Sequence, residues 1–230
     1  MIASPDLRLG VIALLAWDSA VERYRKGDTV EDSDVHLRAA GLLLEDGRLD
    51  RDWEDALGVA ATVHEGLVMV ASMGDVVFLS NVYLGRDMTV VARCRAVAEN
   101  GTVVRMEPVV EIALAPTPER WAALARAVPP PMASAPTGRV DAHPVARPDL
   151  PEWVASVEGI VGWEDAPDEL RRSAEAALST DATLAVARGA SSVLWFARGG
   201  DLFRVTGGEV AQVSGVADEL VALSAPSSAE

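Results

Sequence analysis

Seven of the thirteen prolines of this 230-residue chain lie in one segment, residues 129–151 (PPPMASAPTGRVDAHPVARPDLP). Proline fixes the backbone angle φ and has no N–H to donate, so this segment cannot form a helix or a central strand. We expect an extended connector that is semi-rigid where the prolines adjoin. It divides the chain into an N-terminal part, residues 1–128, and a C-terminal part, residues 152–225, and leaves residues 226–230 as a disordered tail.

The N-terminal part begins with a helical pattern. Apolar residues at helical spacing predict helices over residues 6–26, 37–42 and 50–64. Gly27 ends the first of these helices, and Asp50 caps the last one. The apolar residues of that last helix share one face, which we expect to be buried. They are Trp53, Ala56, Leu57, Ala60 and Val63.

From Gly66 the apolar period changes from that of a helix to the period of two that is typical of strands. Four strand-like runs follow: LVMVAS, VVFLSNVYL, MTVVARCRAVA and TVVRMEPVVEIAL. Short loops with a glycine separate them, which predicts an antiparallel meander. Pro108 has no backbone donor, so its strand must be an edge at that point or carry a bulge. A helix over 117–128 follows, with Thr117 as its cap and Pro118 at its first position.

The last hairpin of this meander has two possible registers. A three-residue loop at 99–101 sets Arg93 against Glu107 and Cys94 against Met106. A two-residue Asn-Gly loop instead sets Cys94 against Glu107. The longer loop is favoured because it pairs charge with charge and apolar with apolar.

The C-terminal part repeats this order. A helix around residues 167–178 precedes four strand-like runs, TLAVAR, SSVLWFAR, LFRVT and EVAQV, and a helix over 216–223 follows them. The predicted fold class is therefore α+β. We expect two similar lobes, each an antiparallel meander sheet flanked by helices, related by an approximate two-fold axis.

Charge and hydropathy exclude two classes of partner. The net charge is −15; residues 1–128 hold 20 acidic and 13 basic residues (net −7), and the remainder holds 15 and 7 (net −8). A field of this sign repels nucleic-acid phosphates, so no nucleic-acid partner is expected. The apolar run VIALLAW, residues 11–17, is too short to cross a bilayer, and no basic segment precedes it as in a signal peptide. We expect a cytoplasmic protein.

No residue pattern indicates catalysis, and we expect neither a metal nor a cofactor. His36, His64 and His143 have no second ligand at a suitable spacing. Ser214 lies between a strand and a helix but lacks the GxSxG frame of a nucleophile elbow, so it is expected to cap the helix. Cys94 alternates with arginines along its strand and is expected on the core face.

The segment LRAAGLLLEDGRLDRDWEDALGVAA, residues 37–61, carries a family resemblance. Its Gly-Leu, acidic-glycine turn, Asp and helix are similar to a segment of the EspG family, the cytosolic chaperones of type VII (ESX) secretion. The order of two similar halves is also like that of the family. A winged-helix DNA-binding module would place basic residues just before this segment, where VEDSDVH is acidic instead.

The resemblance implies a non-catalytic protein that holds a helical secretion substrate of the PE–PPE type soluble before export. Aromatic residues are over-represented among binding hot spots, and we expect the partner to contact aromatics of the C-terminal part, which would equally suit a core. They are Trp153, Trp163, Trp195, Phe196 and Phe203. Two alternatives stay open: an immunity-type or regulatory protein that binds a basic partner through its acidic surface, and a small hydrolase built around Ser214.

Overall fold

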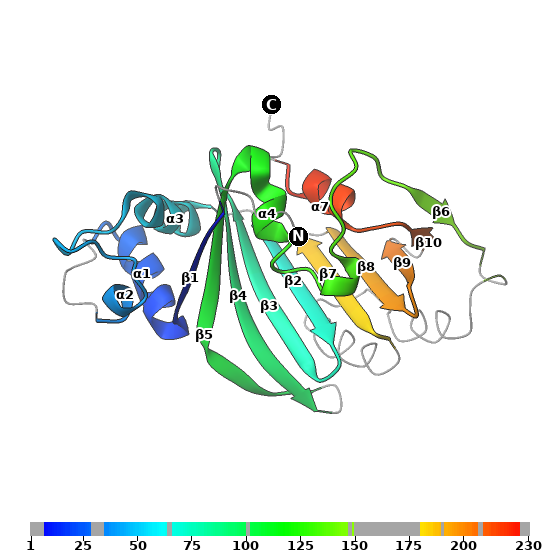
Figure 1. The fold of residues 1–230 in the computed structure, drawn as a ribbon, viewed down its shortest axis with the longest axis horizontal. Helices are drawn as coiled ribbons and strands as arrows, with labels where there is room; N and C mark the ends of the chain where they lie inside the picture. Colours follow the sequence, from blue (N-terminus) through cyan, green and yellow to red (C-terminus); the bar gives the residue numbers. More distant parts are fainter. Residues whose placement is uncertain are drawn as a thin grey trace.

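A computed structural model describes residues 7–28, 35–63, 66–99, 102–146, 149, 180–189, 191–206 and 209–225. Within these residues, ten strands form one antiparallel sheet, with short helices on both of its faces (Figure 1). The protein is therefore of the α+β class, as predicted. None of the described helices has the length and apolar character that a membrane span requires.

The strands alternate with few helices along the chain. The strands are β1 (Arg8–Ala13), β2 (Gly66–Met73), β3 (Val76–Leu84), β4 (Met88–Glu99), β5 (Thr102–Pro116), β6 (Ala142–Pro144), β7 (Ala182–Arg188), β8 (Ser191–Arg198), β9 (Asp201–Thr206) and β10 (Glu209–Val213). The α-helices are α1 (Leu14–Arg25), α2 (Val35–Ala39), α3 (Arg51–Thr62), α4 (Arg120–Leu124) and α7 (Ala217–Leu223). Two 3-10 turns occur at Thr117–Glu119 and Pro130–Met132. The predicted helix at 167–178 and the tail at 226–230 lie outside the described residues.

Both predicted meanders are confirmed, but they do not form separate sheets. The strand order is β1-β5-β4-β3-β2-β7-β8-β9-β10-β6. The first strands of the two meanders, β2 and β7, pair antiparallel from Val68 opposite Ala187 to Ser72 opposite Thr183. Each of these strands would otherwise be an exposed edge, and their pairing removes both edges. The expected two lobes do not each have a separate sheet, because the two meanders share one; the division at residues 129–151 stays a prediction.

The N-terminal segment differs from the predicted helix over 6–26. Residues 8–13 form the edge strand β1, and α1 begins only at Leu14 and ends where Gly27 adopts a positive φ. Ile12 is buried, whereas Leu9 and Val11 are exposed, which is the alternation of a half-buried strand. The helical spacing of the apolar residues was misleading because a short apolar run suits either structure.

Helix α3 matches its prediction closely. The carboxylate of Asp50 accepts a hydrogen bond from the backbone N–H of Asp52 and so caps the helix. The predicted stripe is buried from Trp53 to Ala60, and Val63 is half-buried just after the helix end.

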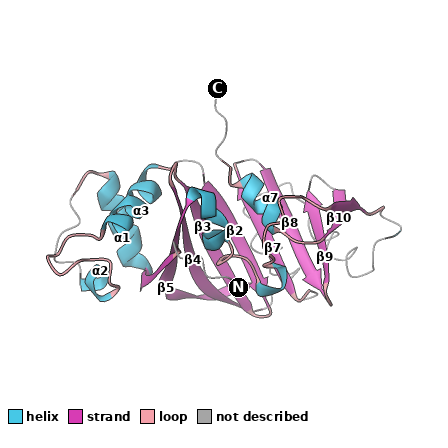
Figure 2. Cartoon of the chain, turned by 45° about the horizontal axis from the view of Figure 1, so that its top comes forward, coloured by secondary structure: helices cyan, strands magenta, loops and turns pink. Residues whose placement is uncertain are grey.

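The two faces of the sheet carry different cover. Helices α4 and α7 pack on one face, which we call the α4 face, over a single apolar core that extends from β5 to β10. Helices α1 and α3 pack on the opposite face, the α3 face, at the β1 end of the sheet (Figure 2). A further buried cluster, which includes Val70, Leu194 and Phe196, lies on the α3 face farther along the sheet.

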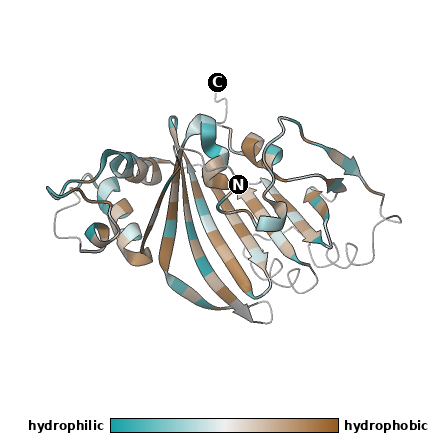
Figure 3. Cartoon of the chain, viewed as in Figure 1, coloured by the Kyte–Doolittle hydropathy of each residue, from teal (hydrophilic) through white to brown (hydrophobic). Residues whose placement is uncertain are grey.

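The β4–β5 hairpin protrudes beyond the other strands, and hydrophilic and hydrophobic residues alternate along it (Figure 3). Its observed register differs from the favoured prediction. Glu99 pairs with Thr102, so the connecting loop has two residues and not three, and Arg93 opposes Glu111 and not Glu107. A shift between Cys94 and Ala96 places three residues of β5, including Pro108, opposite one residue of β4. The predicted bulge at Pro108 is thus confirmed.

A half-buried ion cluster holds the end of α4 against the sheet. Both guanidinium nitrogens of Arg126 that face Glu111 donate to its carboxylate, at 3.0 and 2.9 Å. Arg93 forms an ion pair with Glu111 at 3.2 Å and donates a hydrogen bond to the Arg126 carbonyl. Its guanidinium also lies over the Phe78 ring. Burial alone would raise the pKa of Glu111, but the hydrogen bond from Arg126 and the two positive charges lower it overall. Thr117, the expected cap of this region, donates instead to the Gly85 carbonyl, and that prediction was wrong.

The last helix, α7, is tied to several parts of the fold. Arg204 on β9 pairs with Glu219 at 3.0 Å. Arg120 and Arg188 donate to backbone carbonyls at the C-terminal end of the helix, at 2.6 Å each. Near its N-terminal end the Asp218 carboxylate accepts hydrogen bonds from the connector residue Thr137, which lowers the pKa of Asp218. The connector is therefore fastened to α7.

Candidate functional site

Three of the five aromatic residues predicted to contact a partner are part of the core. Trp195 is completely buried under the helices of the α4 face. Phe196 and Phe203 stack on each other across β8 and β9, with ring centroids 6.0 Å apart, in the buried cluster on the opposite face. A partner cannot reach these side chains in this conformation. Trp153 and Trp163 lie outside the described residues, so their role stays a prediction.

The residues considered for catalysis are not brought together into a reactive group. Ser214 is exposed in the bend between β10 and α7. It does not cap α7, whose N-terminal cap is Val216 without a side-chain hydrogen bond, so that prediction was wrong. His143 lies on the exposed edge strand β6, 3.2 Å from Asp141. No group of three or more His, Cys, Asp or Glu in the described part of the chain could hold a metal ion.

Cys94 has the environment of a structural thiol. It is buried beneath α1 and α3, on the core face predicted for it. Burial and the nearby negative charge of Asp18 both raise the pKa of its thiol, so the reactive thiolate is disfavoured at neutral pH.

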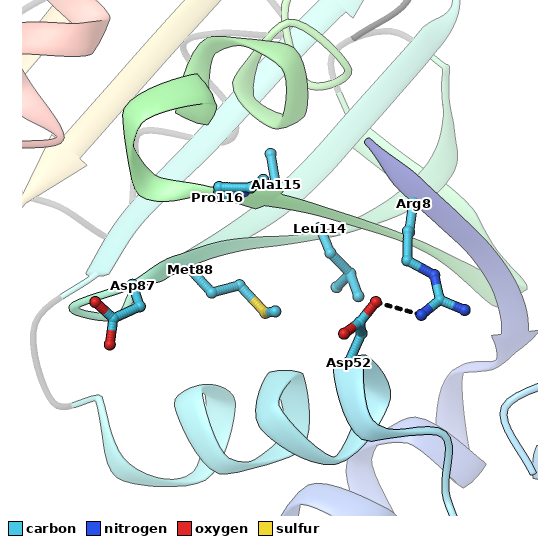
Figure 4. Close-up of a pocket in the computed structure, with 7 residues that line it drawn as sticks. All are labelled: Arg8, Asp52, Asp87, Met88, Leu114, Ala115 and Pro116. Atoms are coloured by element: carbon cyan, nitrogen blue, oxygen red, sulfur yellow. Dashed lines mark hydrogen bonds and ion pairs between the residues drawn. The ribbon is translucent and has the colours of Figure 1, made fainter. Parts of the chain in front are cut away.

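One hollow of about 570 Å³ lies between α3 and the adjoining ends of β4 and β5 (Figure 4). The Arg8–Asp52 ion pair is at one end and Asp87 is at the other. The floor between them is apolar and comprises Met88, Leu114, Ala115 and Pro116. The hollow is open to solvent, and the residues that line it include no serine, threonine, cysteine or histidine.

The charges at the Arg8 end of this hollow are paired within the protein. Arg8 on β1 donates to Asp50 at 2.7 Å and to Asp52, and its guanidinium lies over the Trp53 ring. The hydrogen bond from Arg8 lowers the pKa of Asp50, so this carboxylate stays ionised at neutral pH. The ion pair explains the position of α3 better than it explains ligand binding, because Arg8 joins the cap of α3 to the edge of the sheet.

The strongest candidate for a binding surface is an exposed strip in the middle of the sheet. We call Val68, Asn81 and Ala187 the central strip, because Val68 on β2 directly opposes Asn81 on β3 and Ala187 on β7. Val68 is 53% exposed and Asn81 is exposed, whereas Ala187 is half-buried. An antiparallel sheet can leave one face open to water, normally with polar residues outward, so Val68 stands out because an apolar side chain occupies this exposed position in the middle of the sheet.

The position of the central strip follows from side-chain alternation. Val68 shares its face with Val70, which belongs to the buried cluster farther along the α3 face. Asn81 opposes Ala92, which is buried beneath α1 and α3. The central strip therefore lies on the α3 face, between two regions of that face that are buried.

The sequence carries one signal of this strip. Ser80 and Asn81 are the two polar residues of the strand VVFLSNVYL, and Asn81 lies between the apolar residues Val68 and Ala92 of the neighbouring strands. Val68 gave no signal, because LVMVAS is apolar at alternate and intervening positions and predicts burial on both faces.

No protein-family model matches this chain, and a search of curated proteins found no significant match.

Proposed function

We propose that this protein is a non-catalytic, EspG-like chaperone of the cytoplasm, which binds a helical client on the central strip of its sheet. The observation that carries the proposal is the exposure of Val68 on β2. Strand β2 is hydrogen-bonded to β3 on one side and to β7 on the other. It has no free edge, so a client cannot add a strand there and must make contact through side chains.

A helix is the element that best fits such a surface. Helices cover sheet faces by packing an apolar stripe on the side chains that stand out from the strands. The same face already receives α1 and α3 in this manner at the β1 end of the sheet. A client helix on Val68 and Ala187 would extend that helical layer, with Asn81 available for a hydrogen bond to the client.

The order of the strands also supports a kinship with the EspG fold. We propose that a two-fold axis passes between β2 and β7 and relates the two halves of the chain. From either edge of the sheet the order is one strand from before the meander, then the meander from its last strand to its first. Helix α4 follows the first meander and α7 the second, and both pack on the same face.

The net charge of −15 fits a chaperone that must stay soluble while it exposes an apolar surface. It is equally compatible with the alternative of an acidic protein that binds a basic partner. Salt separates the two, because ionic contacts between exposed groups weaken as ionic strength rises, whereas apolar contacts persist.

The experiment is affinity capture of the tagged protein from its source organism, with mass-spectrometric identification of the bound chains. Wild type is compared with Val68→Glu and with the control Val104→Glu, which changes a valine of similar exposure, 52%, on the protruding part of β5. We expect a helical protein in stoichiometric amount, retained by Val104→Glu at 0.5 M salt and lost from Val68→Glu. A non-helical partner, release of the partner by salt, or binding that Val68→Glu leaves intact would contradict the proposal.

A further inference from the structure

Strand β1 presents an unpaired edge of the sheet. It pairs with β5 on one side, from Arg8 opposite Leu114 to Ala13 opposite Val109, and stands at the end of the strand order. Its other side has no strand partner among the described residues. The outward backbone N–H and C=O groups of an edge strand form a template for pairing with another strand.

The exposed side chains of β1 are apolar. Leu9 and Val11, two residues apart, both lie on the α4 face of the strand. Val109 of β5 is exposed next to them on the same face. Leu15, at the start of α1, is exposed as well. Helices α1, α2 and α3 contribute to the core on the other face of this end of the sheet, and the side chains of Leu9 and Val11 are 49% and 58% exposed.

The strand at the opposite edge of the sheet, β6, has features that prevent it from pairing with a strand of another molecule. It has only three residues, ends in Pro144, and carries His143 beside Asp141. Short length, proline and charge are the features that keep edges from pairing. Strand β1 has six residues, no proline and no register shift against β5. Its one charged residue, Arg8, is bound by Asp50 and Asp52.

We propose that β1 is a dimerisation strand and that a second copy of this chain occupies its free edge. Two β1 strands pair antiparallel around a two-fold axis with Gly10 opposite Gly10 of the second copy. This register sets Leu9 of each copy opposite Val11 of the other on the α4 face, where the four side chains bury one another. The two sheets then become one continuous sheet.

A second copy fits this edge better than a strand of another protein. A two-fold contact requires a self-complementary surface, and RLGVIA provides one, with apolar residues at spacing two and no unpaired charge. The inference does not depend on the proposed client site, because Leu9 and Val11 lie on the α4 face and Val68 on the α3 face.

The test is sedimentation velocity of the full chain over a concentration series, with wild type, Val11→Lys and the control Val140→Lys. Val11 is 58% exposed and Val140, beside the protected edge, is 50% exposed, so neither lysine disturbs the core. We expect a concentration-dependent dimer for wild type and Val140→Lys, and at least about tenfold weaker association for Val11→Lys. Because each copy carries a charge of −15, added salt should strengthen the dimer.

Amide hydrogen exchange of residues 8–13 gives the second measurement. In the dimer the outward amides of β1 gain hydrogen bonds, so their exchange should slow as the protein concentration rises. A wild type that stays monomeric throughout the series would overturn the proposal. A dimer that survives Val11→Lys, or one that forms without slowing exchange in β1, would also overturn it and would assign the contact to another surface.

Discussion

Gly10 on β1 lies directly against the ring of Trp53 on α3. A Cβ atom at position 10 would lie 2.7 Å from Cη2 of the indole, closer than two carbon atoms can approach. Trp53 is buried and held by the packing of α3, so its ring has little room to move. The absence of a side chain at position 10 is therefore what allows the helix to pack closely on the edge strand.

The first prediction concerns this contact. Gly10→Ala should lower the free energy of unfolding by about 1–3 kcal/mol, because the added methyl group overpacks the interface between β1 and α3. Urea denaturation measures the change, at a protein concentration low enough to avoid association. Gly58→Ala within α3 serves as the control, since its Cβ would meet only the hydroxyl end of Tyr24 at 3.3 Å. Equal effects of the two substitutions would contradict the packing described for Gly10.

A second prediction tests the junction between β2 and β7. The hydroxyl oxygens of Ser72 and Thr183 are 2.6 Å apart and buried in this seam. Thr183→Val should destabilise the protein by about 1–3 kcal/mol, because it leaves the Ser72 hydroxyl buried without this partner. The double variant with Ser72→Ala should cost at least about 0.5 kcal/mol less than the sum of the two single variants. Simple additivity in urea denaturation would argue against this hydrogen bond.

A third prediction uses the ion cluster under α4. The folded-state pKa of Glu111 is lowered, so the stability that it contributes is fully present above its unfolded pKa of about 4.3 and is lost as the pH falls through the folded value. Glu111→Gln should cost about 1.5–3 kcal/mol at pH 7, and the difference from wild type should shrink below about pH 4.

The control for Glu111 is Glu22→Gln, which removes an exposed ion pair on α1 and should have a much smaller effect. Denaturant unfolding at a series of pH values gives both curves. If the penalty of Glu111→Gln were the same at pH 3.5 and pH 7, the ionised carboxylate would not be the stabilising species.

A fourth prediction concerns the single cysteine. Because Cys94 is buried and the pKa of its thiol is raised, the native protein should react with a thiol reagent at least about tenfold more slowly than the unfolded protein. The measurement is absorbance-monitored thiol titration with and without denaturant. Fast reaction of the native protein would indicate that α1 and α3 open readily from the sheet.

Local signals in the sequence predicted the eight strands of the two meanders and the start of α3, but neither β1 nor β6. The meander after Gly66, the Asp50 cap and the bulge at Pro108 each depend on residues close in the chain, and all three were predictable. Gly27 as the end of α1 is of the same kind.

Features that depend on distant residues were not predictable. The pairing of β2 with β7 joins segments more than a hundred residues apart, and no local pattern specifies it. Strand β1 looked helical because its partner β5 lies about a hundred residues later. Charge pairing alone did not predict the β4–β5 register, because the bulge at Pro108 shifts the strands and sets Arg93 opposite a different acid, Glu111.

The candidate binding site was even less predictable from the sequence than the fold, because it depends on residues far apart in the chain. Aromatic content pointed to Trp195, Phe196 and Phe203, yet apolar size favours burial as much as binding, and all three are buried. The central strip became visible only when the strands were arranged, since exposure of Val68 depends on which parts of the α3 face are covered.

The most direct test of the helix-binding account is site-specific photo-cross-linking from the central strip in living cells of the source organism. A photoreactive amino acid replaces Asn81, which is exposed on β3, and a second variant carries it at Val104 as the comparison position. The account predicts a cross-link from position 81 to a helix of one client protein, with little or none from position 104. Cross-links from position 104 alone, or from position 81 to a non-helical segment, would contradict it.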